Sequence, residues 1–315
     1  MRLLNRKTTF DFIGRRKIAF LFSATLIVLS IASLSLRGLN FGLDFTGGAL
    51  IEVAYSKAPD LQQVRDNLQA AGLDDAVVQT FGLDTEIVVR IPPRDEEESS
   101  ADLSTLVLEA LQRDYAGVID MRRVEFVGPQ VGDELTEQGI LAVVYALIGI
   151  FLYVMMRFQW RFSVGAVAAL VHDVIITMGV ISLLAVEFDL TVVAALLAVI
   201  GYSLNDTIVL FDRIRENFPR LRNSKPFEVV NTSINQTLSR TLMTSMTTLL
   251  VLIALFIFGG EIINAFAFTL IIGIVVGTYS SIYVASTTLL ELGVSKFDLM
   301  AVEKEGATAV LDENP

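Results

Sequence analysis

The chain has 315 residues, of which 53% are hydrophobic, and a formal net charge of -11. Its mean hydropathy of +0.60 is more apolar than one soluble core of this size requires, which indicates burial in lipid. The acidic balance argues against a nucleic-acid partner. The sequence has no cysteine and a single histidine, His172, so it lacks the residues for a disulfide, a thiolate site or a multi-histidine metal site.

Six apolar stretches have about the length needed to cross a hydrocarbon core as helices. They are 18–36, 138–156, 162–186, 190–211, 241–258 and 262–290. The first stretch follows Arg15, Arg16 and Lys17, as a signal peptide would, but its apolar run is long and no small-residue cleavage pattern follows it. We therefore predict a polytopic α-helical membrane protein with six transmembrane helices.

Basic residues in the short connections set the expected orientation. They lie in the N-terminal segment 1–17, in the connection 157–161 and in an expected cytoplasmic loop over 212–240. The connections around Glu187 and Gly260 contain no basic residue. Alternation of the six spans then places the N-terminus and the tail 291–315 in the cytoplasm.

The polar segment 37–137 between the first two spans is predicted to be an extracytoplasmic domain. Apolar, β-branched runs predict strands and helical spacing predicts helices. The expected order is a strand at 49–55, a helix at 58–71, strands at 76–81 and 85–91, a helix at 101–115 and a strand at 122–127. This order is that of a ferredoxin-like α/β fold. The acidic connection 92–100 is expected to be a solvated loop.

Ionisable groups inside membrane spans are costly, so their presence indicates function. The third predicted span contains His172 and Asp173, the fourth contains Asn205 and Asp206, and the fifth begins after Arg240. The helical rise places His172 about 15 Å and Asp206 about 9 Å from the cytoplasmic ends of their spans. A cluster is therefore possible if the third, fourth and fifth spans are neighbours.

These residues suggest a proton relay. Because arginine keeps its proton, Asp206 is the group expected to titrate, alternating between a neutral acid and an ion pair with Arg240. Asn205 and nearby threonines would hold water beside it. Three structural interpretations stay open: Arg240 as a snorkelling residue, Asp206 as a static helix contact and His172 as a hydrogen-bonded core group.

Glycines mark two further places. Gly42, Gly47 and Gly48 follow the first span, but the Lys-Ser/Thr ending of a phosphate loop is missing there, so nucleotide binding is not expected. In the spans, Gly273 and Gly277 form a small-xxx-small pair, which is typical of close helix packing. Close helix packing is expected at Gly201 as well.

Several motifs in this order resemble the SecF family of the bacterial Sec translocon, within the resistance-nodulation-division superfamily. They are Phe41–Gly48, Val124–Gly132, Val171–Val174, Val199–Val209, Phe211–Asn217, Leu238–Leu242 and Phe258–Gly260. The extracytoplasmic motif positions are Gly42, Asp44, Gly47, Gly48, Gly128, Pro129 and Gly132. The resemblance covers nearly the whole chain, without a departure at these positions.

The resemblance implies a non-enzymatic subunit of the bacterial inner membrane that pairs with SecD and associates with SecYEG, YajC and YidC. Such a subunit uses the proton motive force to promote late stages of preprotein translocation. Asp206 and Arg240 occupy the family positions implicated in proton transport. No cofactor is implied; protons are the expected coupling ion, and sodium stays open.

Three other functions remain alternatives. A proton-driven small-molecule exporter of the same superfamily would share the bundle but normally carries two halves in one chain. A passive assembly scaffold would move no ion. An intramembrane aspartyl protease would need two facing carboxylates, which Asp173 and Asp206 could supply, but neither lies in a recognisable protease motif.

Overall fold

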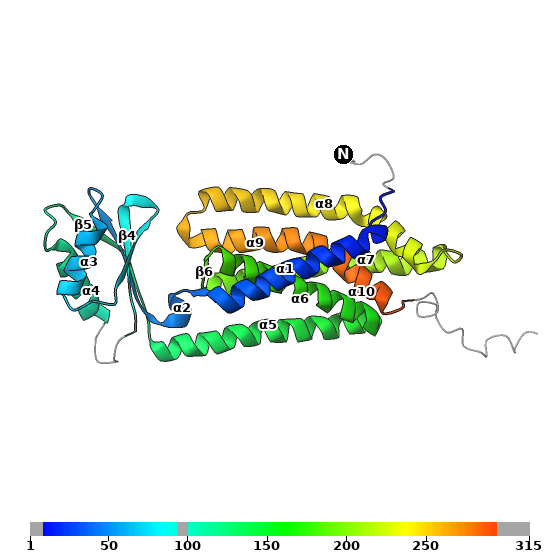
Figure 1. Cartoon of the computed structure of the whole chain (residues 1–315), viewed down its shortest axis with the longest axis horizontal. Helices are drawn as coiled ribbons and strands as arrows, with labels where there is room; N and C mark the ends of the chain where they lie inside the picture. Colours follow the sequence, from blue (N-terminus) through cyan, green and yellow to red (C-terminus); the bar gives the residue numbers. More distant parts are fainter. Residues whose placement is uncertain (1–8, 94–99, 295–315) are drawn as a thin grey trace, which may run out of the picture.

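The computed structural model describes residues 9–93 and 100–294. The first eight residues of the segment 1–17, most of the acidic connection 92–100 and most of the tail 291–315 therefore lie outside the described residues. Figure 1 shows an elongated molecule in which a small α/β domain lies at one end of a bundle of long helices.

The bundle consists of long apolar helices that run side by side (Figure 1). They are α1 (Arg16–Arg37), α5 (Pro129–Arg157), α6 (Trp160–Leu183), α7 (Leu190–Arg220), α8 (Pro226–Phe258) and α9 (Glu261–Ser280). A π-helical turn, η2 (Ser281–Ala285), and α10 (Ser286–Glu291) continue α9. Six apolar segments within these helices are long enough to cross a membrane, which confirms the predicted fold class.

The segment 212–240, expected as a cytoplasmic loop, is helical over most of its length. Helix α7 continues to Arg220, and α8 already begins at Pro226. Ile214 and Phe218 on one extension and Ile234 on the other belong to one buried apolar cluster. Their burial stabilises helical extensions that a hydropathy window cannot detect.

Hydrogen bonds join the helices at both ends of the bundle. At the end expected to be cytoplasmic, Arg215 of α7 donates to the Arg157 carbonyl at the end of α5 (3.3 Å). At the opposite end, Arg37 of α1 donates to the Leu183 carbonyl at the end of α6 (2.9 Å). Helices α6 and α7 are the most buried, whereas few residues of the apolar segments of α1, α5 and α8 are buried.

The domain at the end of the bundle has the predicted ferredoxin-like order. Its elements are β2 (Gly48–Tyr55), α3 (Leu61–Ala70), β3 (Val77–Phe81), β4 (Leu83–Ile91), α4 (Ser100–Gln112) and β5 (Ile119–Val127). The sheet order is β3-β4-β2-β5, with antiparallel neighbours throughout. Alternate strand residues, such as Ile51, Val53 and Val89, form one core with Val64 and Leu68 of α3 and with residues of α4.

Candidate functional site

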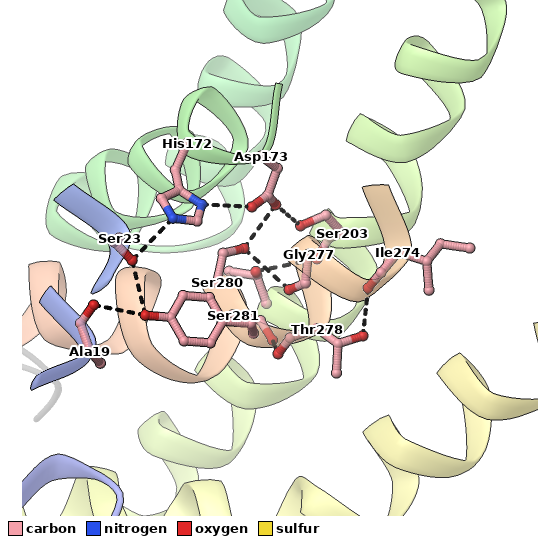
Figure 2. Close-up of polar contacts among 12 residues, drawn as sticks. Ala19, Ser23, His172, Asp173, Ser203, Ile274, Gly277, Thr278, Ser280 and Ser281 are labelled. Carbon is pink, nitrogen blue, oxygen red and sulfur yellow. Dashed lines mark hydrogen bonds and ion pairs between the residues drawn. The ribbon is translucent and has the colours of Figure 1, made fainter. Parts of the chain in front are cut away.

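Asp173 of α6 lies at the centre of a polar network inside the bundle (Figure 2). Its side chain is buried, and its Oδ2 accepts hydrogen bonds from Ser203 of α7 (2.6 Å) and Ser280 of α9 (2.8 Å). Its Oδ1 lies 3.0 Å from Nδ1 of His172. A carboxyl group removed from water needs such partners, so three helices are held together at one residue.

The network continues from His172 to α1. Its Nε2 lies 3.1 Å from the Ser23 hydroxyl, which lies 3.0 Å from the Tyr279 hydroxyl of α9. The Tyr279 hydroxyl donates to the Ala19 carbonyl (2.8 Å). Because a hydroxyl has one proton, Ser23 must then donate to Tyr279 and accept from Nε2–H of His172.

This order of donors determines the proton content of the His172–Asp173 pair. With Nε2 protonated, the contact between Nδ1 and Oδ1 requires one more proton, on either atom. The pair is therefore an imidazolium beside a carboxylate, or a neutral imidazole beside a carboxylic acid. Either way the two side chains share one proton inside the membrane span.

Asp206 is also buried, with 4% of its surface exposed, and it faces α8 from α7. On α8, the Ser245 side chain is a hydrogen-bond partner of its carboxylate, and Arg240 lies near enough for a favourable charge interaction. The Ser245 hydroxyl also bonds Thr278 of α9 (2.8 Å). Asp206 and Arg240 are thus neighbours across α7 and α8, although among the described residues no ion pair joins them within 4.0 Å.

Helix α7 connects the two carboxyl groups. Ser203, which bonds Asp173, precedes Asp206 by three residues, which is about 4.5 Å along the axis and a neighbouring position on the helix surface. A shift of α7 therefore acts on both sites. Asn205, between them in sequence, is exposed, as is Arg240 on α8.

Close packing at two glycines allows α9 to approach α7. A Cβ atom added at Gly273 would lie 2.1 Å from a methyl group of Val199, and one at Gly277 would lie 2.9 Å from Cβ of Ser203. Gly277 therefore packs where Ser203 and Asp173 meet, as Figure 2 shows, and Gly273 packs against Val199 on the same helix. Gly201 is exposed, and a Cβ added there would meet nothing within 4 Å. The helix packing predicted at Gly201 is therefore not seen within this chain.

The motif after the first span joins the external domain to α7. The short strand β1 (Asn40–Phe41) pairs with β6 (Glu187–Phe188) of the α6–α7 connection. It is followed by the helical turn α2 (Leu43–Thr46), from which Asp44 accepts a hydrogen bond from the Leu190 backbone amide (2.9 Å). Asp189 accepts from the Val192 amide (2.9 Å), so two carboxylates cap the start of the helix that carries Asp206.

Other motif glycines permit close backbone approach at this junction. Gly48 has a φ of +111°, and a Cβ there would lie 2.2 Å from the Ile91 carbonyl. A Cβ at Gly132 of α5 would lie 3.0 Å from the Phe45 carbonyl, and one at Gly42 would lie 3.0 Å from Glu187. Gly47 also has a positive φ. A Cβ added at Gly128 would meet nothing within 4 Å. Pro129 is the first residue of α5, a position that suits proline.

An ion pair bridges the external sheet and the bundle. Arg90 of β4 donates to Glu187 at 2.6 Å, and both side chains are partly exposed. The pair borders a cavity of about 430 Å³ that also contacts Glu52 and Asn264, so it lies between the open face of the sheet and the ends of the bundle helices. The external domain therefore contacts the α6–α7 connection directly.

Sequence reasoning did not identify Ser23, Ser203, Ser280 and Tyr279, because uncharged polar residues are common in membrane helices. Only the packing of the helices brings Ser203 and Ser280 into contact with Asp173, and Ser23 into contact with His172 and Tyr279. Arg90 and Glu187 were also missed, since a single charge in a strand or loop gives no signal. Among the described residues, no group of three acidic or histidine side chains forms a candidate metal site.

Together, the six apolar spans of the described residues, the ferredoxin-like domain at the end of the bundle and the buried carboxyl groups define a polytopic membrane protein with an ionisable network at its centre. The model for protein export membrane protein SecD/SecF, C-terminal, matches residues 107–295, and that for the SecD/SecF GG motif matches residues 32–59. The chain therefore belongs to the SecD/SecF family of protein-export membrane proteins.

Similar proteins cover almost the same length. The protein translocase subunit SecF of Vibrio alginolyticus is 54% identical over 100% of this chain and 99% of its own. That of Pseudomonas aeruginosa is 49% identical over 98% of each chain. A crystal structure of SecDF from Thermus thermophilus matches with a TM-score of 0.80 and 39% identity, covering 93% of this chain. This chain spans 39% of the length of that SecDF chain.

Proposed function

We propose that the chain acts in protein export as the SecF-type subunit of a Sec translocase and uses ion flow through its bundle to drive that work. Full-length similarity to translocase subunits named SecF supports the export role. The single observation that supports ion coupling is the pair of buried carboxyl groups, Asp173 and Asp206, on adjacent membrane helices. Enclosed acids of this kind are costly unless they serve a function.

A SecD subunit is the proposed partner. The matched SecDF chain contains a segment similar to this one together with a larger remainder, which is consistent with two functional parts in one chain. The exposed apolar faces of α5 and α8 leave room for another bundle within the membrane. SecYEG, YajC, YidC and the translocating preprotein are further proposed partners, by family resemblance.

In the proposed cycle, Asp206 gains and loses a proton on the cytoplasmic half of α7. When it is neutral, its attraction to Arg240 is lost and the contact between α7 and α8 weakens. Movement of α7 is transmitted through Asp44 and the α6–α7 connection to the external domain, which acts on the emerging polypeptide. The membrane potential supplies about 2.3 kcal/mol for each charge that crosses 100 mV.

The test uses cells depleted of their own subunit and proteoliposomes that contain this chain, its SecD partner and the translocon. Asp206→Asn should reduce export in both to the level seen without an ion gradient. Asp212→Asn is the matched control, since Asp212 lies on the same helix but is partly exposed and forms an ion pair with Arg157 at 3.6 Å. Unchanged export in Asp206→Asn would remove Asp206 from the mechanism and favour a passive scaffold.

The coupling ion is tested separately. A proton gradient without sodium and a sodium gradient without a pH difference are each imposed on the proteoliposomes. Protons are the proposed ion, so export should follow the proton gradient alone; dependence on sodium alone would replace protons by sodium. Uptake of small cationic dyes in the same vesicles tests the exporter alternative.

The protease alternative is disfavoured by geometry. Both oxygens of Asp173 are bonded by side chains of this chain, and the residue is fully enclosed. A catalytic carboxyl group must reach a water molecule and a peptide bond. Asp173 is therefore proposed to hold a proton and to position helices.

A further inference from the structure

A second cavity, of about 790 Å³, opens along the membrane-facing side of α1, between α1, α6 and α10. We call it the α1 groove. Its lining on α1 recurs every three or four residues, as one helical stripe. The α1 residues of the groove are Arg16, Ala19, Phe20, Ser23, Ala24, Ile27 and Val28.

Small residues form part of the wall of the groove. Ala19, Ser23 and Ala24 of α1 face Ala168 of α6. The π-helical turn η2 contributes Tyr283 to the wall. A π-helical turn departs from the regular hydrogen-bond pattern of an α-helix and is frequently found at functional sites. At its floor the groove reaches Ser23 and His172, so it contacts the buried polar network.

The length of the groove matches one leaflet of a bilayer. From Arg16 to Val28 the helix rises about 18 Å. A hydrocarbon core is about 30 Å thick, so the groove extends from the cytoplasmic interface to just past the midplane. One acyl chain of the inner leaflet has this reach, whereas a membrane-crossing helix extends through both leaflets.

A basic run flanks the end of the groove that is expected to be cytoplasmic. Of this run, Arg16 lines the groove and lies 3.9 Å from Glu291, which also lines it. Arg15 and Lys17 flank Arg16 in sequence and are exposed, and among the described residues they have no ion-pair partner within 4.0 Å, so they leave an excess of positive charge beside this end. The hydroxyl-bearing Thr287 and Thr288 also line this end and can donate to a phosphate oxygen.

We propose that the α1 groove binds one anionic phospholipid of the cytoplasmic leaflet. An acyl chain lies along the apolar stripe, and the phosphate lies at Arg15, Arg16 and Lys17. Basic pockets between helices on the cytoplasmic side attract anionic head groups. A partner helix fits less well, because its cytoplasmic end would itself be enriched in basic residues and would face like charge.

The test is photocrosslinking in native membranes and in purified complex, with phosphatidylglycerol that carries a photoreactive acyl chain. The label should concentrate on the α1 stripe and on residues 283–292. Unlabelled phosphatidylglycerol should compete better than phosphatidylcholine. Arg15→Gln with Lys17→Gln should weaken labelling by about 25-fold, about fivefold for each charge removed. Arg220→Gln with Arg222→Gln removes the same charge elsewhere on the cytoplasmic side and should leave labelling unchanged.

A groove-filling variant tests the cavity itself. Ala24→Leu should abolish labelling, whereas Ala32→Leu, on an exposed position of α1 outside the groove, should not. A thermal-unfolding measurement of each variant shows whether the fold is retained. Equal labelling on all faces of α1, equal competition by both lipids, or capture of a partner subunit at Ala24 in place of lipid would each overturn the proposal.

Discussion

Nδ1 of His172 lies 3.0 Å from Oδ1 of Asp173, and the donors around the two side chains require that they share one proton. The pair lies where α1, α6, α7 and α9 meet, next to the helix that carries Asp206 (Figure 2). Protonation and helix packing are thus linked at a single place in the bundle.

We expect Asp173→Asn to preserve the fold and Asp173→Ala to disrupt it. The asparagine oxygen can accept from Ser203 and Ser280 while its amide donates to Nδ1 of His172. We expect a loss of less than about 1 kcal/mol in the free energy of unfolding for asparagine. Alanine leaves two hydroxyls and an imidazole without partners and should cost about 2–5 kcal/mol. Denaturation in detergent micelles would measure both; equal losses would contradict the network.

The protonation of each ring nitrogen of His172 can be measured directly, because the chain has one histidine. Nitrogen-15 labelling of histidine therefore reports on His172 alone. We expect Nε2 to be protonated in the native protein and in Asp173→Asn, with Nδ1 unprotonated in the variant. An unprotonated Nε2 in the folded protein would show that Ser23 donates to the ring and that the proposed order is reversed.

Helix packing at Gly273 should be sensitive to one methyl group. Gly273→Ala places its Cβ 2.1 Å from a Val199 methyl and should destabilise the bundle by about 1–3 kcal/mol. Val199→Ala in the same chain should recover part of that loss, since it removes the clashing group. Gly201→Ala, which meets nothing within 4 Å, is the control and should be neutral or slightly stabilising.

Asp44 should stabilise the external end of α7. Asp44→Ala removes the acceptor of the Leu190 amide and should cost about 0.5–2 kcal/mol locally. Asp44→Asn keeps an acceptor but loses the favourable charge, so its cost should be about 0.3–1 kcal/mol. Hydrogen exchange of the first turn of α7 would report this; unchanged protection in Asp44→Ala would mean that Asp189 caps the helix alone.

Chemical crosslinks can test whether the external domain must move against the bundle. The chain has no cysteine, so introduced pairs react alone. A bismaleimide joining Arg90→Cys to Glu187→Cys should inhibit export, because it replaces a breakable ion pair by a covalent link. A disulfide joining Asn40→Cys to Glu187→Cys, which face each other in the β1–β6 ladder, should form without inhibition. Inhibition by both, or by neither, would contradict the proposed motion.

We expect Tyr55 to lower the free energy of unfolding of the external domain in alkali. Burial, and to a lesser extent the neighbouring Tyr115, raises the pKa of Tyr55 to about 12, and its hydroxyl is buried without a hydrogen-bond partner. Between pH 10 and 12 the unfolded chain releases this proton while the folded domain keeps it, so stability falls as the pH rises, by up to about 2 kcal/mol. Thermal unfolding of Tyr55→Phe should lack this part of the decline, and an identical alkaline decline in both proteins would contradict it.

The membrane spans and the order of the external domain could be predicted from the sequence, because both depend on local patterns. Hydrophobic length identifies a span, and strand and helix periods identify the βαββαβ order. Asp173 and Asp206 could also be singled out, since a charge inside an apolar run is conspicuous in the sequence itself. The helical extensions of α7 and α8 were not predicted, because apolar contacts between two separate segments stabilise them.

What the sequence determined by itself was therefore the class of membrane protein, its expected orientation and the identity of its buried acids. Only the tertiary structure decided which groups those acids and His172 contact. Ser23, Ser203 and Ser280 come from three different helices, and Asp44 reaches Leu190 across 146 residues of chain. Such partners are chosen by the packing of helices that are distant in sequence, and small residues such as Gly277 allow the close approach that the hydrogen bonds require.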